Sequence, residues 1–436
     1  MNDRQALMLL VLTAGAFLVP LVSERIGWFT APCEMLYGIL VVNLLPGADH
    51  PGVFITTLAQ FGFLLLLFLA GLEIDFTLLE RRGPLLLARS GLAALGLQAI
   101  AFLLGVLFRL PPIYILLLGA LSISLLLVVL KQMNLAQTPF GQTLLVIGAI
   151  GEFFTILEVT GYDLVSRYGV GWPLALAILK LLALLLAGYV MLRWLNRAAG
   201  ENPGPFRRLF ALRDETELGV RAALAFMLAF AGIAVLLHVE QILATFIAGA
   251  VCSFAFRGQN TLTKKLTTMG QGFFVPIFFI TVGMGLRFTD LLRGDAIKLV
   301  LGLLIAMLLV RLVALPLLAL AGLSWRASLP AALLLGAPLT LMVAIAQVGI
   351  NLGQLQASTH GAVLCVAILS AVLYPLFGRA LLRREQEARA TAPRRLRRYT
   401  LRLRAPALAH MRLRQALAYA PMPVPHAESD LAPPQG

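Results

Sequence analysis

The sequence predicts an all-α membrane protein with about 13 transmembrane helices, arranged as two inverted six-helix repeats with broken crossing helices. Of its 436 residues, 60% are hydrophobic and only 13% are charged, with a mean hydropathy of +0.89. Soluble domains carry about 25% charged residues, so this composition excludes an ordinary soluble enzyme. Apolar stretches recur along the chain, and basic residues concentrate in alternate connections between them.

Dividing the chain by apolar length and by charged or Pro/Gly breaks gives thirteen segments close to the length of one membrane span. No A-x-A-like cleavage site follows the first segment, so we interpret it as a retained helix and not as a secretion signal. The segments cover residues 6–22, 26–45, 53–75, 84–108, 112–131, 139–164, 172–195, 217–237, 240–256, 270–286, 297–321, 327–350 and 360–382.

Lysine and arginine in the connections predict the orientation. With the C-terminus in the cytoplasm, the inner connections hold 15 of these residues and the outer set holds six. The positive-inside rule therefore predicts that the N-terminus lies outside. We expect the protein in the inner membrane of a bacterial cell. The polar linker 198–216 then separates two six-helix groups, and the odd seventh span gives the groups opposite orientations, which is the topology of an inverted repeat.

The C-terminal segment differs in composition from the rest. We expect a transmembrane domain over residues 1–382 and a basic, Pro-containing, disordered cytoplasmic tail over 383–436. This tail holds 11 Arg and four acids, half of the net charge of +14. A basic segment directly after the last span is typical of an anchor to anionic membrane lipid, which we favour over nucleic-acid binding. The three cysteines are far apart and predict no metal site or cofactor.

Two segments carry helix-breaking residues at corresponding places in the two groups. The fifth segment holds Ser122 and Ser124 after a Gly-Ala step, and the twelfth holds Gly336, Pro338 and Thr340. Proline removes a helical hydrogen bond, and freed carbonyls with hydroxyl oxygens at membrane depth suit a small cation. The alternative is that these small residues only allow close helix packing.

Charged residues inside apolar segments are costly and therefore need a reason. Glu152 lies in the middle of the sixth segment and Arg311 in the middle of the eleventh. We expect the two to meet or to share one aqueous cavity at the ion and proton site; the alternative is a fixed structural ion pair. The secondary candidates, for which solvation or helix capping is the alternative, are Glu34, Glu73, Asp75 and Glu158.

Three stretches resemble signatures of the second cation:proton antiporter family, within the sodium/proton exchanger superfamily. They are Phe68–Asp75, Phe274–Met284 and Thr245–Gly249. The resemblance covers roughly residues 7 to 382. It implies a panel domain and a mobile core domain that moves substrate by an elevator-like shift, usually in a homodimer.

By this resemblance the family's ion-binding acid corresponds to Glu152 and its basic residue to Arg311. Its two crossing helices correspond to the fifth and twelfth segments.

The chain departs from the family in three places. Members usually carry Asp at the position of Glu152, preceded by Asp, Asn or Gln, where this chain has Gly151. The family's Arg-Gly-Glu is replaced by residues 337–339, and a proline common in the fifth span is absent.

The predicted function is antiport of a monovalent cation, Na⁺ or K⁺, against H⁺, without enzymatic activity. One deep carboxylate neutralised either by a proton or by a cation makes the two compete, and Gly151 cannot titrate, which predicts an electroneutral cycle. The alternatives are an organic-anion transporter on the same fold, with Arg311 as the substrate clamp, and a non-transporting membrane sensor or scaffold.

Overall fold

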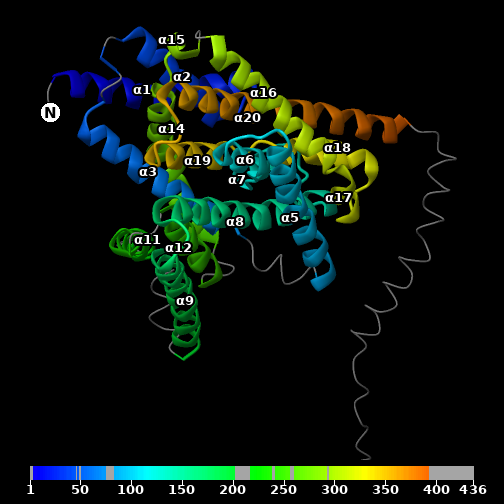
Figure 1. Ribbon diagram of the computed structural model, residues 1–436, viewed down its shortest axis with the longest axis horizontal. Coiled ribbons are helices and arrows are strands. Elements are labelled where there is room, and N and C mark those ends of the chain that lie inside the picture. The colour runs from blue at the N-terminus through cyan, green and yellow to red at the C-terminus, as the bar shows by residue number, and fades with distance from the viewer. Residues whose placement is uncertain are drawn as a thin grey trace, which may run out of the picture. The chain divides into compact units, whose positions relative to one another are not determined.

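The computed structural model describes residues 3–45, 47–48, 51–74, 83–201, 217–237, 241–255, 260–291 and 294–391. These residues form helices and their connections, with no β-strand among them (Figure 1). The chain divides into a large unit, Met1–Leu381, and a second unit, Leu382–Gly436. Nearly all of the expected tail lies outside the described residues, and so does Asp75.

The first half of the large unit contains two helices of 30 residues, α8 and α9, and one broken span. In chain order its helices are α1 (Asp3–Ile26), α2 (Thr30–Leu44), α3 (Val53–Leu72), α5 (Pro84–Leu107), α6 (Pro112–Gly119), α7 (Ser124–Gln132), α8 (Pro139–Tyr168) and α9 (Trp172–Glu201).

The second half of the large unit also combines long helices with shorter, interrupted ones. Its elements are α11 (Leu218–Leu237), α12 (Gln241–Ala255), α13 (Asn260–Met269), the π-helix η1 (Gly270–Phe274), α14 (Val275–Met284), α15 (Phe288–Leu291), α16 (Gly294–Val313), α17 (Leu315–Leu320), α18 (Trp325–Leu335), α19 (Leu339–Asn351) and α20 (Ala357–Thr391).

Among the described residues, ten helices are long and apolar enough to cross a membrane, or eleven if the bent pair α18 and α19 forms one span. Two further apolar helices, α2 and α12, are shorter than the usual span. All thirteen expected segments coincide with helices, but length and composition do not confirm thirteen spans. The tenth segment is longer than expected, because helical structure begins at Asn260 and continues through η1 into α14.

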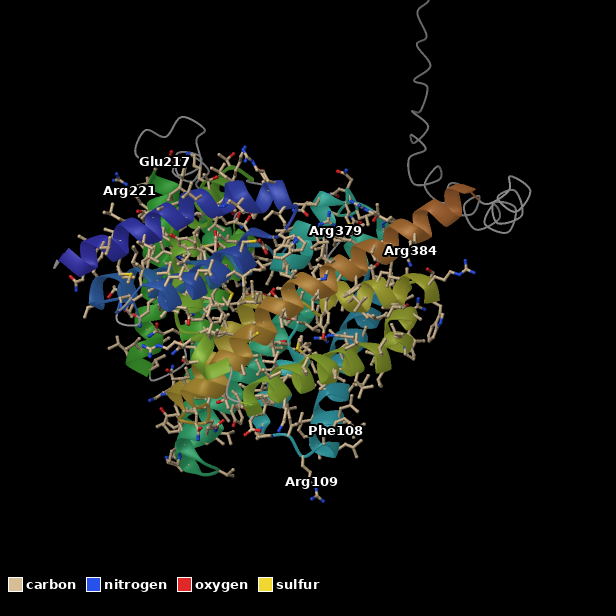
Figure 2. All side chains as sticks on the ribbon, turned by 90° about the horizontal axis from the view of Figure 1, so that it is seen from above. Phe108, Arg109, Glu217, Arg221, Arg379 and Arg384 are labelled. Carbon is tan, nitrogen blue, oxygen red and sulfur yellow. The ribbon has the colours of Figure 1, made fainter. Side chains whose placement is uncertain are left out.

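The outer surfaces of the helices match a hydrocarbon environment. Large apolar side chains are exposed along α1, α5, α11 and α16, far more than a soluble monomer tolerates. Examples are Phe17, Leu107, Leu236 and Ile305. Charged groups gather instead at helix ends, as Figure 2 shows for Arg109 before α6 and for Glu217 and Arg221 at the start of α11. The chain is a multi-pass membrane protein.

The helices pack in two groups. The α3 bundle consists of α1, α2, α3, α11, α12, α13, η1 and α14, and the α8 bundle consists of α5, α6, α7, α8, α16, α17, α18, α19 and α20. Helix α9 contacts both α8 and α12, so it connects the two groups. The predicted broken spans both belong to the α8 bundle.

Two close crossings hold the α3 bundle together, and both depend on glycine. A Cβ atom at Gly71 on α3 would lie 2.2 Å from the Phe246 carbonyl of α12, and one at Gly249 on α12 would lie 2.0 Å from the Phe68 carbonyl of α3. Helices α2 and α14 cross in the same reciprocal way through Gly38 and Gly283. The signature stretches noted in the sequence therefore lie at backbone-to-backbone contacts.

Candidate functional site

The centre of the α8 bundle is the break between α6 and α7. Residues 120–123 leave the helical path there, as the extended backbone of Ala120 shows. A helix end leaves backbone N–H or C=O groups without partners, which is costly in an apolar interior. The break therefore presents the negative end of α6 and the positive end of α7 to neighbouring side chains.

Glu152 binds the positive end of α7. Its side chain comes from the middle of α8 and is 1% exposed. Oε2 accepts a hydrogen bond from the Ile123 backbone N–H at 3.0 Å, and Oε1 accepts one from the Ser122 hydroxyl at 3.1 Å. A carboxylate at a helix N-terminus is favoured both by these donors and by the helix dipole.

Arg311 binds the opposite half of the same break. It comes from α16, is fully buried, and its Nη2 donates to the Ala120 carbonyl at 2.7 Å. Its Nε and Nη1 have no hydrogen-bond partner among the described residues. No ion pair joins Arg311 to Glu152 in the part of the chain that the structure describes. The two charges therefore do not meet in this structure, because each binds a different end of the broken span. The other expected arrangement, one aqueous cavity shared by both, stays a prediction.

The second break joins α18 to α19 with a bend of 45°. Gly336 ends α18 and Pro338 precedes the first residue of α19. Thr340, in the first turn of α19, lies 3.3 Å from the Ser122 hydroxyl, oxygen to oxygen. The structure thus brings Ser122, Thr340 and Glu152 into one hydrogen-bonded group where the two broken spans meet.

Glu73 approaches this group from the α3 bundle. It ends α3, and its carboxylate faces the Ser124 hydroxyl at the start of α7. Its Oε2 is buried without a hydrogen-bond partner among the described residues, and it lies close enough to Glu152 for electrostatic repulsion. A carboxylate at a helix C-terminus is opposed by the helix dipole, so a bound cation or proton would stabilise it.

The structure places two other secondary candidates, Glu34 and Glu158, away from this group. Glu34 is buried on α2, which packs against α1 and α14 in the α3 bundle. Glu158 follows Glu152 by six residues on α8, which places it about 9 Å further along the helix axis and on a different face. Asp75 lies outside the described residues.

Sequence reasoning missed a polar network that fixes the break. The Thr155 hydroxyl donates to the Gly151 carbonyl at 2.8 Å and accepts from the Gln98 amide at 2.9 Å and from the Leu121 backbone N–H at 3.2 Å. Two signals were present in the sequence. Thr155 follows Glu152 by three residues and so shares its helix face, and Gln98 is an amide inside an apolar segment.

The structure explains the absence of a side chain at position 151. A Cβ atom on Gly151 would lie 2.3 Å from Leu121 Cδ1 and 2.8 Å from Leu121 Cβ. Leu121 is fully buried, so it has little room to move. Leu121 thus occupies the space that a side chain at position 151 would need. Family members usually carry such a side chain directly before the ion-binding acid.

We therefore expect Gly151→Ala to lower stability by about 1–3 kcal/mol, as overpacking does in other cores. The change should appear as a lower melting temperature of the detergent-solubilised protein. In a Leu121→Ala background the same substitution should cost almost nothing. Gly161→Ala is the matched control, because this glycine also lies on α8 and an added Cβ there meets nothing within 4 Å. Equal costs of Gly151→Ala in both backgrounds would contradict the Leu121 contact.

No group of three or more metal-ligating side chains occurs within the described ranges. The three cysteines are free thiols. The carboxylate and hydroxyl oxygens at the site suit a monovalent cation or a proton better than a resident transition metal. The guanidinium of Arg311 has no acceptor atom and cannot be a ligand of a cation.

The comparisons with known proteins place the chain in a family. A family model described as "Sodium/hydrogen exchanger, transmembrane" matches residues 12–384. The putative Na⁺/H⁺ antiporter YjbQ of Bacillus subtilis is 25% identical over 405 residues, which cover 87% of this chain and 63% of that protein, less than two thirds of its length. A Na⁺/H⁺ antiporter of Enterococcus hirae is 25% identical over 278 residues, covering 62% of this chain and 70% of the relative.

The fold has a solved counterpart. The structure of the sodium proton antiporter MjNhaP1 from Methanocaldococcus jannaschii matches with a TM-score of 0.59 and 15% identity, covering 86% of this chain and 96% of that one. This likeness extends over most of both chains and confirms the helical membrane fold. The family resemblance expected from the signature stretches is confirmed by the family model. The chain belongs to the sodium/hydrogen exchanger family of membrane proteins.

Proposed function

We propose that this protein is an antiporter that exchanges one monovalent cation, Na⁺ or K⁺, for one proton, with Glu152 as the group that both compete for. The observation that carries the proposal is a buried carboxylate held by a backbone N–H and a hydroxyl at the junction of two broken helices. The relatives named as Na⁺/H⁺ antiporters support the same activity. Nothing in the proposal calls for enzymatic chemistry.

The hydroxyls beside Glu152 suit all the states that exchange requires. A hydroxyl both donates and accepts, and its hydrogen rotates freely. With Glu152 charged, Ser122 donates to the carboxylate; with Glu152 protonated, Ser122 accepts its proton in a hydrogen bond. When a cation is bound, Ser122 and Thr340 turn their lone pairs toward it. Hard monovalent cations prefer such oxygen ligands, so one small group of atoms serves both substrates.

Arg311 and Glu73 have supporting roles in this proposal. Arg311 neutralises the negative end of α6 from the side opposite Glu152, which keeps the break open without occupying the carboxylate. Glu73 and Ser124 offer oxygen atoms between the end of α3 and the site, where an entering cation would pass. Gly336 and Pro338 keep the second break open, which lets Thr340 reach Ser122.

The proposed mechanism is elevator-type alternating access by a thirteen-span protein with two inverted repeats. In such a repeat α2 corresponds to α12 and α3 to α14. The two reciprocal glycine crossings, α2 with α14 and α3 with α12, are then symmetry equivalents, which supports the repeat. The α8 bundle carries the site and would move against the α3 bundle, which would form the static part of a homodimer.

We further propose that the protein lies in the inner membrane of a bacterial cell, with its N-terminus outside. The transmembrane domain, residues 1–382, would then be followed by a cytoplasmic tail, residues 383–436, that binds anionic lipid. Positive charge in the inner connections supports this orientation.

Truncation after Arg384 should leave the exchange rate of the folded protein unchanged. We expect the site to form without the tail, since the hydrogen bonds of Glu152 within the described residues come from Ser122 and Ile123. The same truncation should weaken binding of the purified protein to vesicles that contain anionic lipid, because each basic residue contributes about 1 kcal/mol. Loss of exchange in the folded, truncated protein would contradict this division.

The decisive test is fluorescence dequenching in proteoliposomes under an imposed pH gradient. Na⁺, K⁺, Li⁺ and a panel of organic anions are added in turn, and protein-free liposomes give the background. Dequenching that saturates with Na⁺ or K⁺ supports the antiporter. Dequenching by an organic anion alone would support Arg311 as a substrate clamp. This alternative is favoured by its Nε and Nη1 atoms, which have no hydrogen-bond partner among the described residues. If no ion changes the fluorescence, the remaining alternative is a non-transporting membrane sensor or scaffold.

Exchange should be electroneutral, because one carboxylate alternates between one proton and one monovalent cation and Gly151 cannot titrate. A membrane potential is worth about 2.3 kcal/mol per charge per 100 mV, so a charged cycle would respond strongly to it. We expect the rate and end point to stay constant when a valinomycin-set potential is imposed at fixed ion gradients. A severalfold change would mean that a second group, with Glu73 the nearest, joins the transported charge.

A further inference from the structure

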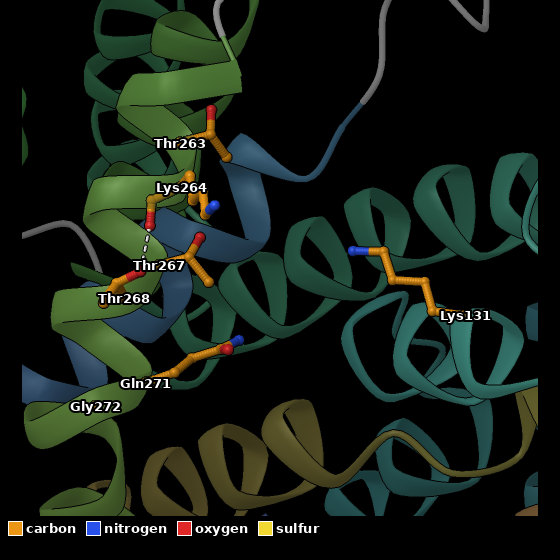
Figure 3. A pocket seen from close by; sticks show the side chains of 7 residues that line it. All are labelled: Lys131, Thr263, Lys264, Thr267, Thr268, Gln271 and Gly272. Carbon is orange, nitrogen blue, oxygen red and sulfur yellow. Dashed lines mark hydrogen bonds between the residues drawn. The ribbon is translucent and has the colours of Figure 1, made fainter. Parts of the chain in front are cut away.

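A pocket lined by residues with polar side chains opens between the two bundles, away from Glu152. Its volume is about 520 Å³, within the range of small-molecule sites. The described residues that line it are Lys131, Thr263, Lys264, Thr267, Thr268, Gln271 and Gly272. Lys131 is at the end of α7 in the α8 bundle, whereas the other lining residues belong to α13 and η1 in the α3 bundle (Figure 3). Anything bound here would touch both bundles.

The charge of the pocket has one sign. Two lysines lie on opposite sides, and Figure 3 shows Lys131 extending toward α13. No acid occurs among the described lining residues, and neither lysine forms an ion pair within the described part of the chain. The neighbouring Lys265, in contrast, is paired with Glu217 at 2.7 Å and does not line the pocket. The two lysines are therefore available to contact an incoming anionic ligand, and Lys131 also interacts electrostatically with Glu73.

The remaining lining residues supply hydrogen bonds. Thr263, Thr267 and Gln271 follow one another at intervals of four, so they form one stripe along α13 and η1. Thr268 already donates to the Lys264 carbonyl, whereas the hydroxyls of Thr263 and Thr267 have no hydrogen bond within the described residues. Ammonium groups surrounded by hydroxyl and amide donors match the oxygens of a phosphate group.

The helix itself is adapted at this place. The pocket-lining residues Gln271 and Gly272 lie in the π-helix η1, a conformation that is rare and often marks functional sites. A Cβ atom at Gly272 would meet nothing within 4 Å, so the glycine leaves open space where any other residue would project a side chain.

We propose that this pocket binds the phosphate group of an anionic ligand and that the bound ligand holds the two bundles together, which slows exchange. The regulatory half rests on the proposed antiport by relative motion of the bundles; the binding half does not. Lys131 also acts electrostatically on Glu73, so an anion bound to Lys131 would reach the approach to the ion site. The phosphate belongs either to a soluble metabolite or to a lipid headgroup.

Binding is tested first, on the full chain in detergent, with inorganic pyrophosphate as the soluble probe and calorimetry as the readout. We expect saturable binding that weakens about fivefold in Lys131→Gln and in Lys264→Gln, and on the order of twentyfold in the double variant. Lys265→Gln is the matched control, since it removes one charge from the same helix outside the pocket, and should bind as wild type. Equal weakening in all three single variants, or no saturation in wild type, overturns the proposal.

A second arm distinguishes the source of the phosphate. Pyrophosphate binding is measured again in nanodiscs of phosphatidylglycerol and of phosphatidylcholine. Weaker apparent binding of pyrophosphate in phosphatidylglycerol than in phosphatidylcholine assigns the pocket to a lipid headgroup, provided that the difference between the two nanodiscs disappears in the double variant Lys131→Gln with Lys264→Gln. Equal binding in the two nanodiscs assigns it to a soluble ligand. Both outcomes support a phosphate site.

Regulation is tested by cation-dependent dequenching in proteoliposomes, with pyrophosphate present on both sides. We expect severalfold inhibition in wild type and in Lys265→Gln, and none in the double lysine variant or in Gly272→Leu, whose side chain fills the pocket. Inhibition that persists in both pocket variants overturns the regulatory proposal. A wild type that binds pyrophosphate but exchanges no cation would instead mean that the proposed antiport is wrong while the binding site stands.

Discussion

Replacing Glu152 by Gln is expected to reduce cation-dependent proton release to the level of protein-free liposomes. A neutral amide carries no charge for a proton or cation to neutralise, so the competition that drives antiport disappears. The fold should persist, because the amide oxygen still accepts from Ser122 or from the Ile123 N–H. The amide NH₂ can donate to the Ser122 hydroxyl, which accepts as well as donates, so the melting temperature should change little. Dequenching and thermal unfolding are measured on the same preparation.

Glu158→Gln is the matched control for this experiment. It makes the same chemical change on the same helix, in a half-buried side chain that has no hydrogen bond to either broken span within the described residues. We expect it to exchange at a rate close to wild type. Wild-type exchange by the Glu152 variant would disprove the role of this carboxylate, and loss of exchange only in the Glu158 variant would transfer the role to the other acid.

The sequence predicted the helices of the fold well, because the length of each apolar stretch follows directly from the order of the residues. Even the fifth and twelfth segments break where Ser122 and Pro338 indicated. The missed features arise where polarity and helicity diverge. Helix α13 carries Lys264 and Lys265 and so falls below any apolar threshold, although it continues into α14 through η1. The eleventh segment, 297–321, is divided between α16, which ends at Val313, and α17, because Pro316 in the first turn of α17 lacks a backbone donor.

The sequence identified the charged residues of the candidate site, Glu152 and Arg311, but not the contacts that they make. Hydropathy identifies Glu152 and Arg311 as costly charges, and it says nothing about which backbone group each one binds. Their separation depends on the path of the chain at residues 120–123, where α6 and α7 offer opposite partial charges. Hydrogen bonds that cross from one helix to another, such as the one from Gln98 to Thr155, depend on tertiary packing and leave only a weak trace in the sequence.

Replacing Arg311 by Met is expected to abolish exchange and to lower stability more than any substitution on the surface. Met fills much of the same space, but the Ala120 carbonyl loses its donor and the end of α6 loses its positive charge. An unsatisfied buried carbonyl costs about 1–3 kcal/mol, and the helix-end charge adds up to about 2 kcal/mol. Dequenching and the melting temperature are the measurements. Arg326→Met, the same change at an exposed position on α18, should leave both unchanged.

A double-mutant cycle between Arg311→Met and Glu152→Gln separates helix capping from a fixed ion pair. If Arg311 stabilises the protein by binding α6, its substitution costs nearly the same whether residue 152 is Glu or Gln, with a coupling energy below about 1 kcal/mol. A buried ion pair behaves differently, because removing one partner leaves an uncompensated charge that costs about 3–5 kcal/mol, and removing the second recovers much of it. The 2.7 Å bond from Arg311 to Ala120 predicts near-additive costs. Strong coupling would show instead that the two charges pair directly in the folded protein.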